Sequence, residues 1–173
     1  MSLEMIAGKP RILEMVEEGV RDERLVIDRD RALEEARALL ERLSGFDANL
    51  AEFDEDVPPI VVVRGSRFIA YVVVLPPGHI VTSLECVKII EKLLVYINKI
   101  KETNKNFVLI FYSKKGVLTT AAYLYLGSVI ENHGIGVLFI NGGADEVLEV
   151  LWHLENTGKY VPSEDESVDL NLE

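Results

Sequence analysis

Two lysines follow a predicted buried strand and could bind a phosphate group. Lys114 and Lys115 lie in the segment YSKKG, between a strand expected over 106–113 and a helix expected over 118–134. Ligands in α/β proteins often bind where strands end. The segment lacks the glycine-rich run and the Lys-Ser/Thr pair of a nucleotide-binding P-loop. We therefore expect an ordinary polar turn, with phosphate binding as the alternative.

The histidines and the single cysteine show no spacing typical of a metal site or of nucleophilic catalysis. His79, His133 and His153 are far apart in the sequence, and no pair has the spacing of metal ligands. Cys86 can form no internal disulfide. It lies beside the apolar stripe of its predicted helix, so we expect it in the core. We predict no catalytic residue, no metal ligand and no cofactor.

Lysines recur along one face of the helix predicted over 82–105. Such a row is usually the solvent-exposed side of an amphipathic helix. The stripe lies in a basic middle segment, because residues 58–134 carry nine basic and four acidic side chains in a chain of net charge −11. Nucleic acid is therefore a possible partner, although the overall charge opposes it. The candidate contacts are Lys88, Lys92, Lys99, Lys114 and Lys115.

The helix predicted over 118–134 is apolar almost all round, which is typical of a helix that is buried on every side or covered by a partner. Two-fold pairing with a second copy is the simplest cover. Tyrosines suit such a contact, because the ring is buried while the hydroxyl finds a polar partner. A helix expected over 10–20 is the alternative cover. We predict a homodimer with contact residues drawn from Tyr123, Tyr125 and Leu126.

Composition indicates a globular chain in a reducing compartment. Apolar residues make up 49% of the 173 residues, so a core can form without disulfides. No apolar run is long enough for a membrane span, and no signal segment is recognisable. With a single cysteine we expect a cytoplasmic location. The absence of glutamine beside abundant Glu, Val, Ile and Leu favours a thermophilic source.

The order of elements predicts an α/β fold. Two apolar β-branched runs flank a turn at 64–67 and form an antiparallel hairpin over 60–75. Two β-α-β units follow, whose strands should be parallel. We expect a mixed central sheet flanked by helices, with residues 72–74 covered on both faces because they are all valine. The predicted units are an N-terminal helical arm over 1–29, the α/β core over 30–158 and an acidic tail over 159–173, expected to be disordered.

This order resembles the restriction-endonuclease-like fold of the PD-(D/E)XK nucleases, a group that includes archaeal Holliday junction resolvases. The resemblance covers about residues 30–141. It rests on the segment ALEEARALLERLSGFDAN, a helix that ends in glycine and an apolar residue before a strand, and on the hairpin VPPIVVVRGSRFIAYVVVLPP. The later segment IENHGIGVLFI is similar to a closing segment of such domains.

The resemblance implies a metal site whose residues this chain lacks. The family places an Asp at the start of the second strand, and a Glu and a Lys one residue apart on the third. The carboxylates bind the metal that activates water. The matching positions are Pro59, Val72 and Val74, and a shift of one residue offers Tyr71 and Val73. The resemblance therefore implies a nuclease-like core without nuclease residues.

An acidic loop could supply replacement ligands. Glu52, Asp54, Glu55 and Asp56 lie just before the hairpin. Carboxylate oxygens are the ligands that hard divalent cations prefer. Without that role such a loop is simply solvated, and this is what we expect here.

A second resemblance is to the STAS domain of anti-sigma-factor antagonists, which also runs from a hairpin through alternating helices and strands. The segment VLTTAAYLYL then lies near that family's phosphorylated serine loop, with Thr119 and Thr120 as candidates. The Asp-Ser-Ser-Gly pattern of that family is absent.

These features favour a non-catalytic protein with a structural or protein-interaction role and an unidentified protein partner. The alternatives are a nucleic-acid-binding protein or weakly active metal-dependent nuclease, and a STAS-like regulatory protein.

Overall fold

Five strands form one mixed sheet in the part of the chain that the structure, a computed structural model, describes: residues 27–53 and 55–158. The sheet order is β1-β2-β3-β5-β7, with antiparallel pairing from β1 to β3 and parallel pairing from β3 to β7. The predicted α/β class with a mixed central sheet is confirmed. The helix expected over 10–20 and the tail over 159–173 lie outside the described residues. The strands are β1 (Asp47–Ala51), β2 (Ile60–Arg64), β3 (Phe68–Val74), β5 (Asn106–Tyr112) and β7 (Gly136–Ile140).

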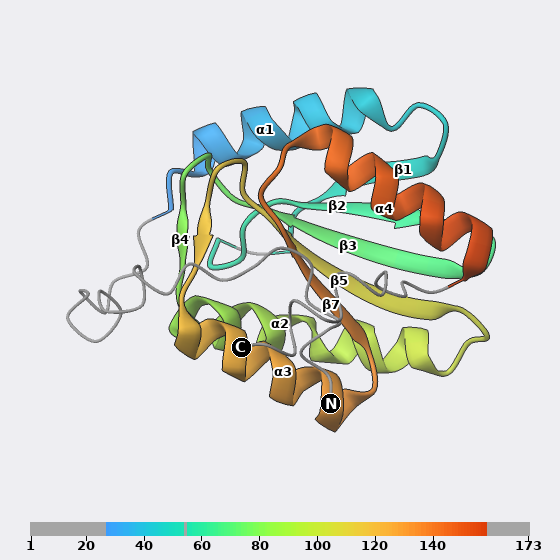
Figure 1. Ribbon diagram of the computed structural model, residues 1–173. Coiled ribbons are helices and arrows are strands. Elements are labelled where there is room, and N and C mark those ends of the chain that lie inside the picture. Colours follow the sequence, from blue (N-terminus) through green and yellow to red (C-terminus); the bar gives the residue numbers. More distant parts are fainter. Residues whose placement is uncertain (1–26, 54, 159–173) are drawn as a thin grey trace.

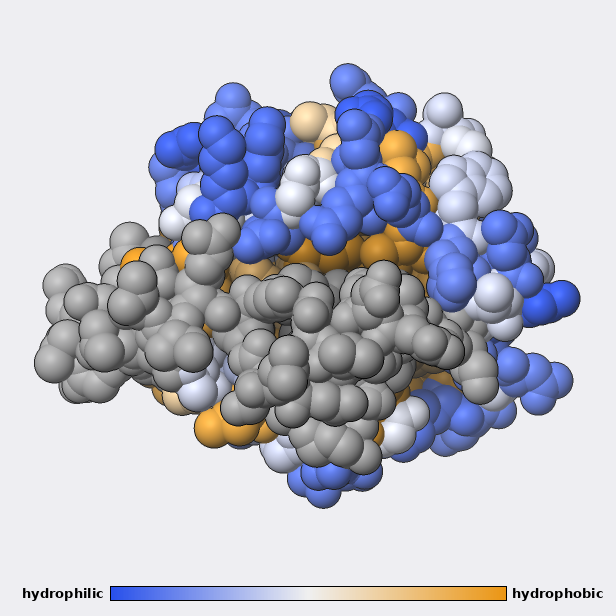
Figure 2. Space-filling view, viewed as in Figure 1, coloured by the Kyte–Doolittle hydropathy of each residue, from blue (hydrophilic) through white to orange (hydrophobic). Residues whose placement is uncertain are grey.

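Helices cover both faces of this sheet (Figure 1). One layer holds α1 (Arg29–Arg42) and α4 (Ala144–Thr157), and the other holds α2 (Ser83–Lys101) and α3 (Thr120–His133). Hydrophilic side chains dominate the outside of the first layer in Figure 2, with an apolar band just below it at the level of the sheet. Each face of the sheet therefore has its own buried apolar cluster.

The middle of β3 is the centre of the core. Val72, Val73 and Val74 are all 0% exposed, which confirms the predicted cover on both faces. Successive side chains on a strand point to opposite faces. Val72 and Val74 accordingly pack in the α1–α4 layer, and Val73 packs in the α2–α3 layer. Neighbouring strands β2 and β5 pair with β3 along its length, so no edge of it meets solvent.

A second, very small sheet was not predicted. It pairs β4 (Ile80–Val81) with β6 (Val117–Leu118) in parallel. The first follows β3 and leads into α2, and the second follows β5 and leads into α3. Both crossovers are thus tied together at the carboxyl ends of the parallel strands.

Side-chain caps begin three of the helices, and one predicted helix is shorter than expected. Thr82 and Glu85 form a capping box at the start of α2, and Thr119 caps α3. The cap of α1 is Asp28, whose carboxylate accepts a hydrogen bond from the amide of Arg31. The predicted helix over 82–105 ends at Lys101, since the chain turns at 102–105. Within the described ranges, no helix is both long enough and apolar enough to cross a membrane.

Candidate functional site

The three positions that match the nuclease motif are buried and apolar. Pro59 is buried at the start of β2, and its carbonyl accepts a hydrogen bond from the amide of Val74. Val72 and Val74 lie under α1 and α4. Alkyl side chains cannot ligate a metal or move a proton. The chemistry that the family performs at these positions therefore has no side chain to carry it.

The alternative register, Tyr71 and Val73, offers no better chemistry. Tyr71 is 8% exposed, and its ring lies 5.1 Å from that of Phe107 and 6.0 Å from that of Phe53. Burial raises the pKa of the Tyr71 phenol above its usual value, an effect only partly opposed by the charge of Arg64. A raised pKa makes the phenolate, the form that a base or an anionic metal ligand requires, harder to reach.

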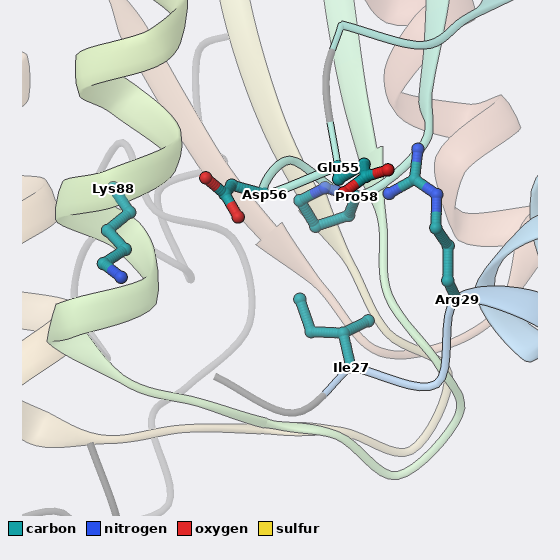
Figure 3. Close-up of a pocket in the computed structure, with 6 residues that line it drawn as sticks. All are labelled: Ile27, Arg29, Glu55, Asp56, Pro58 and Lys88. Carbon is teal, nitrogen blue, oxygen red and sulfur yellow. The ribbon is translucent and has the colours of Figure 1, made fainter. Parts of the chain in front are cut away.

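Two residues of the acidic loop line a pocket beside the start of β2. Its volume is about 190 Å³. Lys88 and Arg29 lie on opposite sides of it, with Asp56 on the Lys88 side and Glu55 on the Arg29 side (Figure 3). Arg29 donates to the carbonyl of Val57 at 2.6 Å. Ile27 and Pro58 complete the lining.

The charges of this pocket are mixed rather than acidic. Glu52, another residue of the loop, pairs with Arg29 at 3.1 Å, and Asp54 lies outside the described residues. Within residues 27–53 and 55–158, no three His, Cys, Asp or Glu side chains are grouped so as to hold a metal ion. The pocket can hydrogen-bond a small polar molecule, but two cations beside two carboxylates do not favour a divalent cation.

A buried acid–histidine pair lies in the β3–α2 connection, and sequence reasoning missed it. His79 Nε2 lies 2.7 Å from Glu85 Oε2, and both side chains are largely buried. The other oxygen, Glu85 Oε1, accepts hydrogen bonds from the amide and the hydroxyl of Thr82. One carboxylate therefore caps α2 and holds the histidine. The capping box was recognisable in the sequence, but the second partner of Glu85 was not.

The YSKKG segment is a tight turn tied to its neighbours. Ser113 Oγ donates to the carbonyl of Pro76 at 2.7 Å and accepts from the amide of His79 at 3.1 Å. Lys115 has φ +62°, a left-handed conformation that is uncommon outside glycine. Both Lys114 and Lys115 are exposed. The buried hydroxyl of Ser113 thus holds the two crossovers together rather than facing a ligand.

The predicted basic stripe is present on α2. Lys88, Lys92 and Lys99 are all exposed, and their spacing of four and seven residues places them on one side of the helix. Leu84 and Val95, 40% and 54% exposed, lie on the same side. We call these five residues the lysine stripe. Lys114 and Lys115 belong instead to the β5–β6 turn.

Of the three predicted dimer contacts on α3, two are buried and one is half-buried. Tyr123 and Leu126 are buried within the chain, because they face the sheet and α2, so they are not on its surface. Tyr125 is half-buried, and burial raises the pKa of its phenol above the usual value. α3 instead exposes Leu124, at 58%, and Figure 2 shows apolar surface in this region at the lower left. The homodimer stays a prediction.

We expect sedimentation of the full chain to show a homodimer that Leu124→Glu converts to a monomer. A charge placed at an apolar contact must be desolvated without a partner, which weakens association. The matched control is Val95→Glu on α2, a similarly exposed valine that should leave the dimer intact. A monomer at high micromolar concentration in the unmodified protein would contradict this prediction.

Thr119, a candidate phosphorylation site under the STAS resemblance, is buried and caps α3. Thr119 is 0% exposed, and its hydroxyl accepts a hydrogen bond from the amide of Ala122 at 3.1 Å. A kinase could reach this oxygen only after the first turn of α3 opened. Thr120 is half-buried in the same turn.

Comparison with known proteins adds no family to this picture: no family model, no curated protein and no solved structure matches the chain. Any function must therefore be argued from the residues themselves.

Proposed function

We propose that this protein is a non-catalytic α/β protein with an inactive nuclease-like core and a structural or protein-interaction role. The observation that carries the proposal is the burial of Val72 and Val74 under α1 and α4, with Pro59 at the third motif position. The order of one helix, three antiparallel strands, a helix and a parallel strand supports the nuclease-like part.

Metal-dependent cleavage has definite requirements. At least one carboxylate must hold a divalent cation beside the scissile phosphate, and the cation must activate a water. Valine and proline supply neither a ligand nor a proton acceptor. Carboxylates in the nearby pocket share it with Arg29 and Lys88, whose charges oppose cation binding. A core that has kept the strands and lost these groups suits a scaffold on which other surfaces act.

We expect no Mg²⁺- or Mn²⁺-dependent cleavage of duplex, branched or single-stranded DNA by the full chain. The assay compares the wild type with Asp56→Ala, which removes a pocket carboxylate, and with Asp47→Ala, which removes an exposed carboxylate on β1. Metal-dependent cutting that survives Asp47→Ala and disappears in Asp56→Ala would overturn the proposal. It would make the acidic loop the active site.

Nucleic-acid binding is a second candidate function, and the lysine stripe is the observation that favours it. Lys88, Lys92 and Lys99 could contact consecutive phosphates, while the net charge of −11 opposes long-range attraction. Three phosphate contacts release counterions, so affinity should fall about 40-fold between 50 mM and 200 mM salt. Binding of this kind is weak at physiological salt.

We expect Lys88→Glu with Lys92→Glu to abolish whatever DNA binding the protein shows at low salt. The matched control is Lys114→Glu with Lys115→Glu, the same charge change on the β5–β6 turn, which should bind as the wild type does. Fluorescence anisotropy across a salt series measures both. Tight binding at physiological salt, lost in the α2 double variant, would make nucleic-acid binding the first function instead.

The proposal also includes a cytoplasmic location and a homodimer or other protein partner. The single cysteine, Cys86, is fully buried, and a chain without disulfides suits the cytoplasm. The exposed Leu124 of α3 suits a homodimer, and the exposed apolar side chains of α2 suit a further protein partner.

A further inference from the structure

We propose that the acidic tail, residues 159–173, binds the lysine stripe of α2 in the same chain and shields it from other anionic partners. The contact does not depend on nucleic-acid binding by the stripe. It rests on charge, on the point where the described chain ends and on the length of chain beyond it.

The charges of the two segments are complementary. The tail carries five acidic side chains and one basic side chain, in a sequence that begins at Lys159. The stripe presents three lysines on exposed turns of α2. Each pair that forms on a protein surface contributes little, but several in one array add up and depend strongly on salt. The acidic residues of the tail are Glu164, Asp165, Glu166, Asp169 and Glu173.

The apolar parts of the two segments also match. Apolar and polar residues alternate in the last six residues of the tail, VDLNLE. The stripe exposes Leu84 and Val95 among its lysines. Burying these side chains against Val168, Leu170 or Leu172 removes apolar surface from water on both sides. A purely electrostatic partner would leave Leu84 and Val95 exposed.

The described chain ends at the same end of the sheet as the carboxyl end of α2. The Gly158 carbonyl accepts a hydrogen bond from the side-chain amide of Asn106 at 2.5 Å. Asn106 follows the last residue of α2, Lys101, by five positions, which span at most about 17 Å. Figure 1 shows the ends of α2 and α4 at the same end of the sheet. The tail therefore starts at the same end of the sheet as Lys99.

The tail is long enough to follow the stripe. Eleven positions of helix separate Lys99 from Lys88, a rise of about 16 Å. The segment from 159 to 173 can span up to about 50 Å when extended. The first acidic residue, Glu164, can thus lie near Lys99 while the end of the chain reaches the start of α2.

Some cations of the described chain are less accessible to the tail, although Arg67, whose side chain packs against Gly158, lies beside its start. Arg42 forms an ion pair with Asp145, and Arg29 pairs with Glu52. Lys114 and Lys115 follow the carboxyl end of β5, while Gly158 lies at its amino end. The seven residues of β5 separate them by about 20 Å. The lysine stripe begins at the end of the sheet where the described chain ends.

The test is paramagnetic broadening from a nitroxide at Leu172→Cys in the full chain. The native Cys86 thiol is fully buried, so the label goes to position 172. We expect amide signals over 84–99 to lose most of their intensity. The intensity should return when Glu164→Gln, Asp165→Asn and Glu166→Gln neutralise the tail. It should also return in about 1 M salt, where the Debye length is about 3 Å.

The matched control neutralises three exposed glutamates on the opposite layer, Glu34→Gln, Glu41→Gln and Glu149→Gln, and should keep the broadening. Signals on α2 that are not broadened, or that stay broadened with the neutralised tail, would overturn the proposal. Broadening found only between labelled and unlabelled molecules in a mixed sample would overturn it too, because the tail would then bind a second copy. None of these outcomes bears on DNA binding or cleavage.

Discussion

Val73→Asp is expected to leave no cooperatively folded protein. Val73 is 0% exposed and lies between Ile60 of β2 and Phe111 of β5 in the central strand. A carboxylate there would lie within a buried cluster of apolar side chains. Burying an unpaired charge or forcing its protonation costs several kcal/mol, a large part of the roughly 5–15 kcal/mol that stabilises a domain. Circular dichroism during denaturant unfolding is the measurement.

The control for this variant is Val95→Asp, the same chemical change at a position that is 54% exposed on α2. It should unfold cooperatively, within about 1 kcal/mol of the wild type. A soluble Val73→Asp protein with a normal unfolding transition would mean that one face of β3 is open to solvent. The burial on which the inactive-core proposal depends would then be wrong.

Glu85→Ala is expected to lower the free energy of unfolding by about 1–3 kcal/mol. The change removes the Glu85 half of the capping box, while the hydroxyl of Thr82, the N-cap of α2, can still accept a hydrogen bond from the backbone amide of residue 85. It also leaves the amide of Thr82 and the ring of His79 without their carboxylate partner in a buried site, which costs about 1–3 kcal/mol. Because β4 and α2 both follow this connection, the loss should destabilise the whole domain.

Two further variants separate the contributions at this site. Glu85→Gln keeps an oxygen for the cap and should cost less than Glu85→Ala. Glu91→Ala removes an exposed glutamate from the same helix and should change stability by no more than about 0.5 kcal/mol. If Glu85→Ala were as stable as Glu91→Ala, the His79–Glu85 contact would contribute nothing to the fold.

Local signals in the sequence predicted much of the fold. The hairpin of β2 and β3 follows from two β-branched runs around a glycine turn, and the register has Ile60 opposite Val73. Thr82 and Glu85 have the spacing of a capping box, and Gly134 ends α3 in the left-handed conformation. These features depend on residues close together in the chain, so a single sequence carries them.

Features set by tertiary contacts were not predictable. β4 and β6 have two residues each, too few for any periodicity, and each is defined only by the other. His79 and Glu85 meet because the β3–α2 connection folds back on itself. Tyr123 and Leu126 were expected at a surface, but neighbours on α2 and the sheet bury them. No pattern within α3 distinguishes those two outcomes.

The candidate site also has one feature that the sequence shows and one that depends on the fold. The valines at the motif positions are visible in the sequence, and their burial follows from an all-apolar strand. The grouping of Glu55 and Asp56 with Arg29 and Lys88 is not visible, because three separate segments bring these residues together. That grouping is what turns an apparently acidic loop into a pocket of mixed charge.

The most direct test of an inactive core is a Mn²⁺ titration of the full chain, followed through paramagnetic broadening of amide signals. The account predicts no saturable broadening at Val72 or Val74, or over residues 55–59, at millimolar Mn²⁺. Saturable broadening centred on those residues, lost in Asp56→Ala, would show a metal site where a nuclease needs one and would contradict the account.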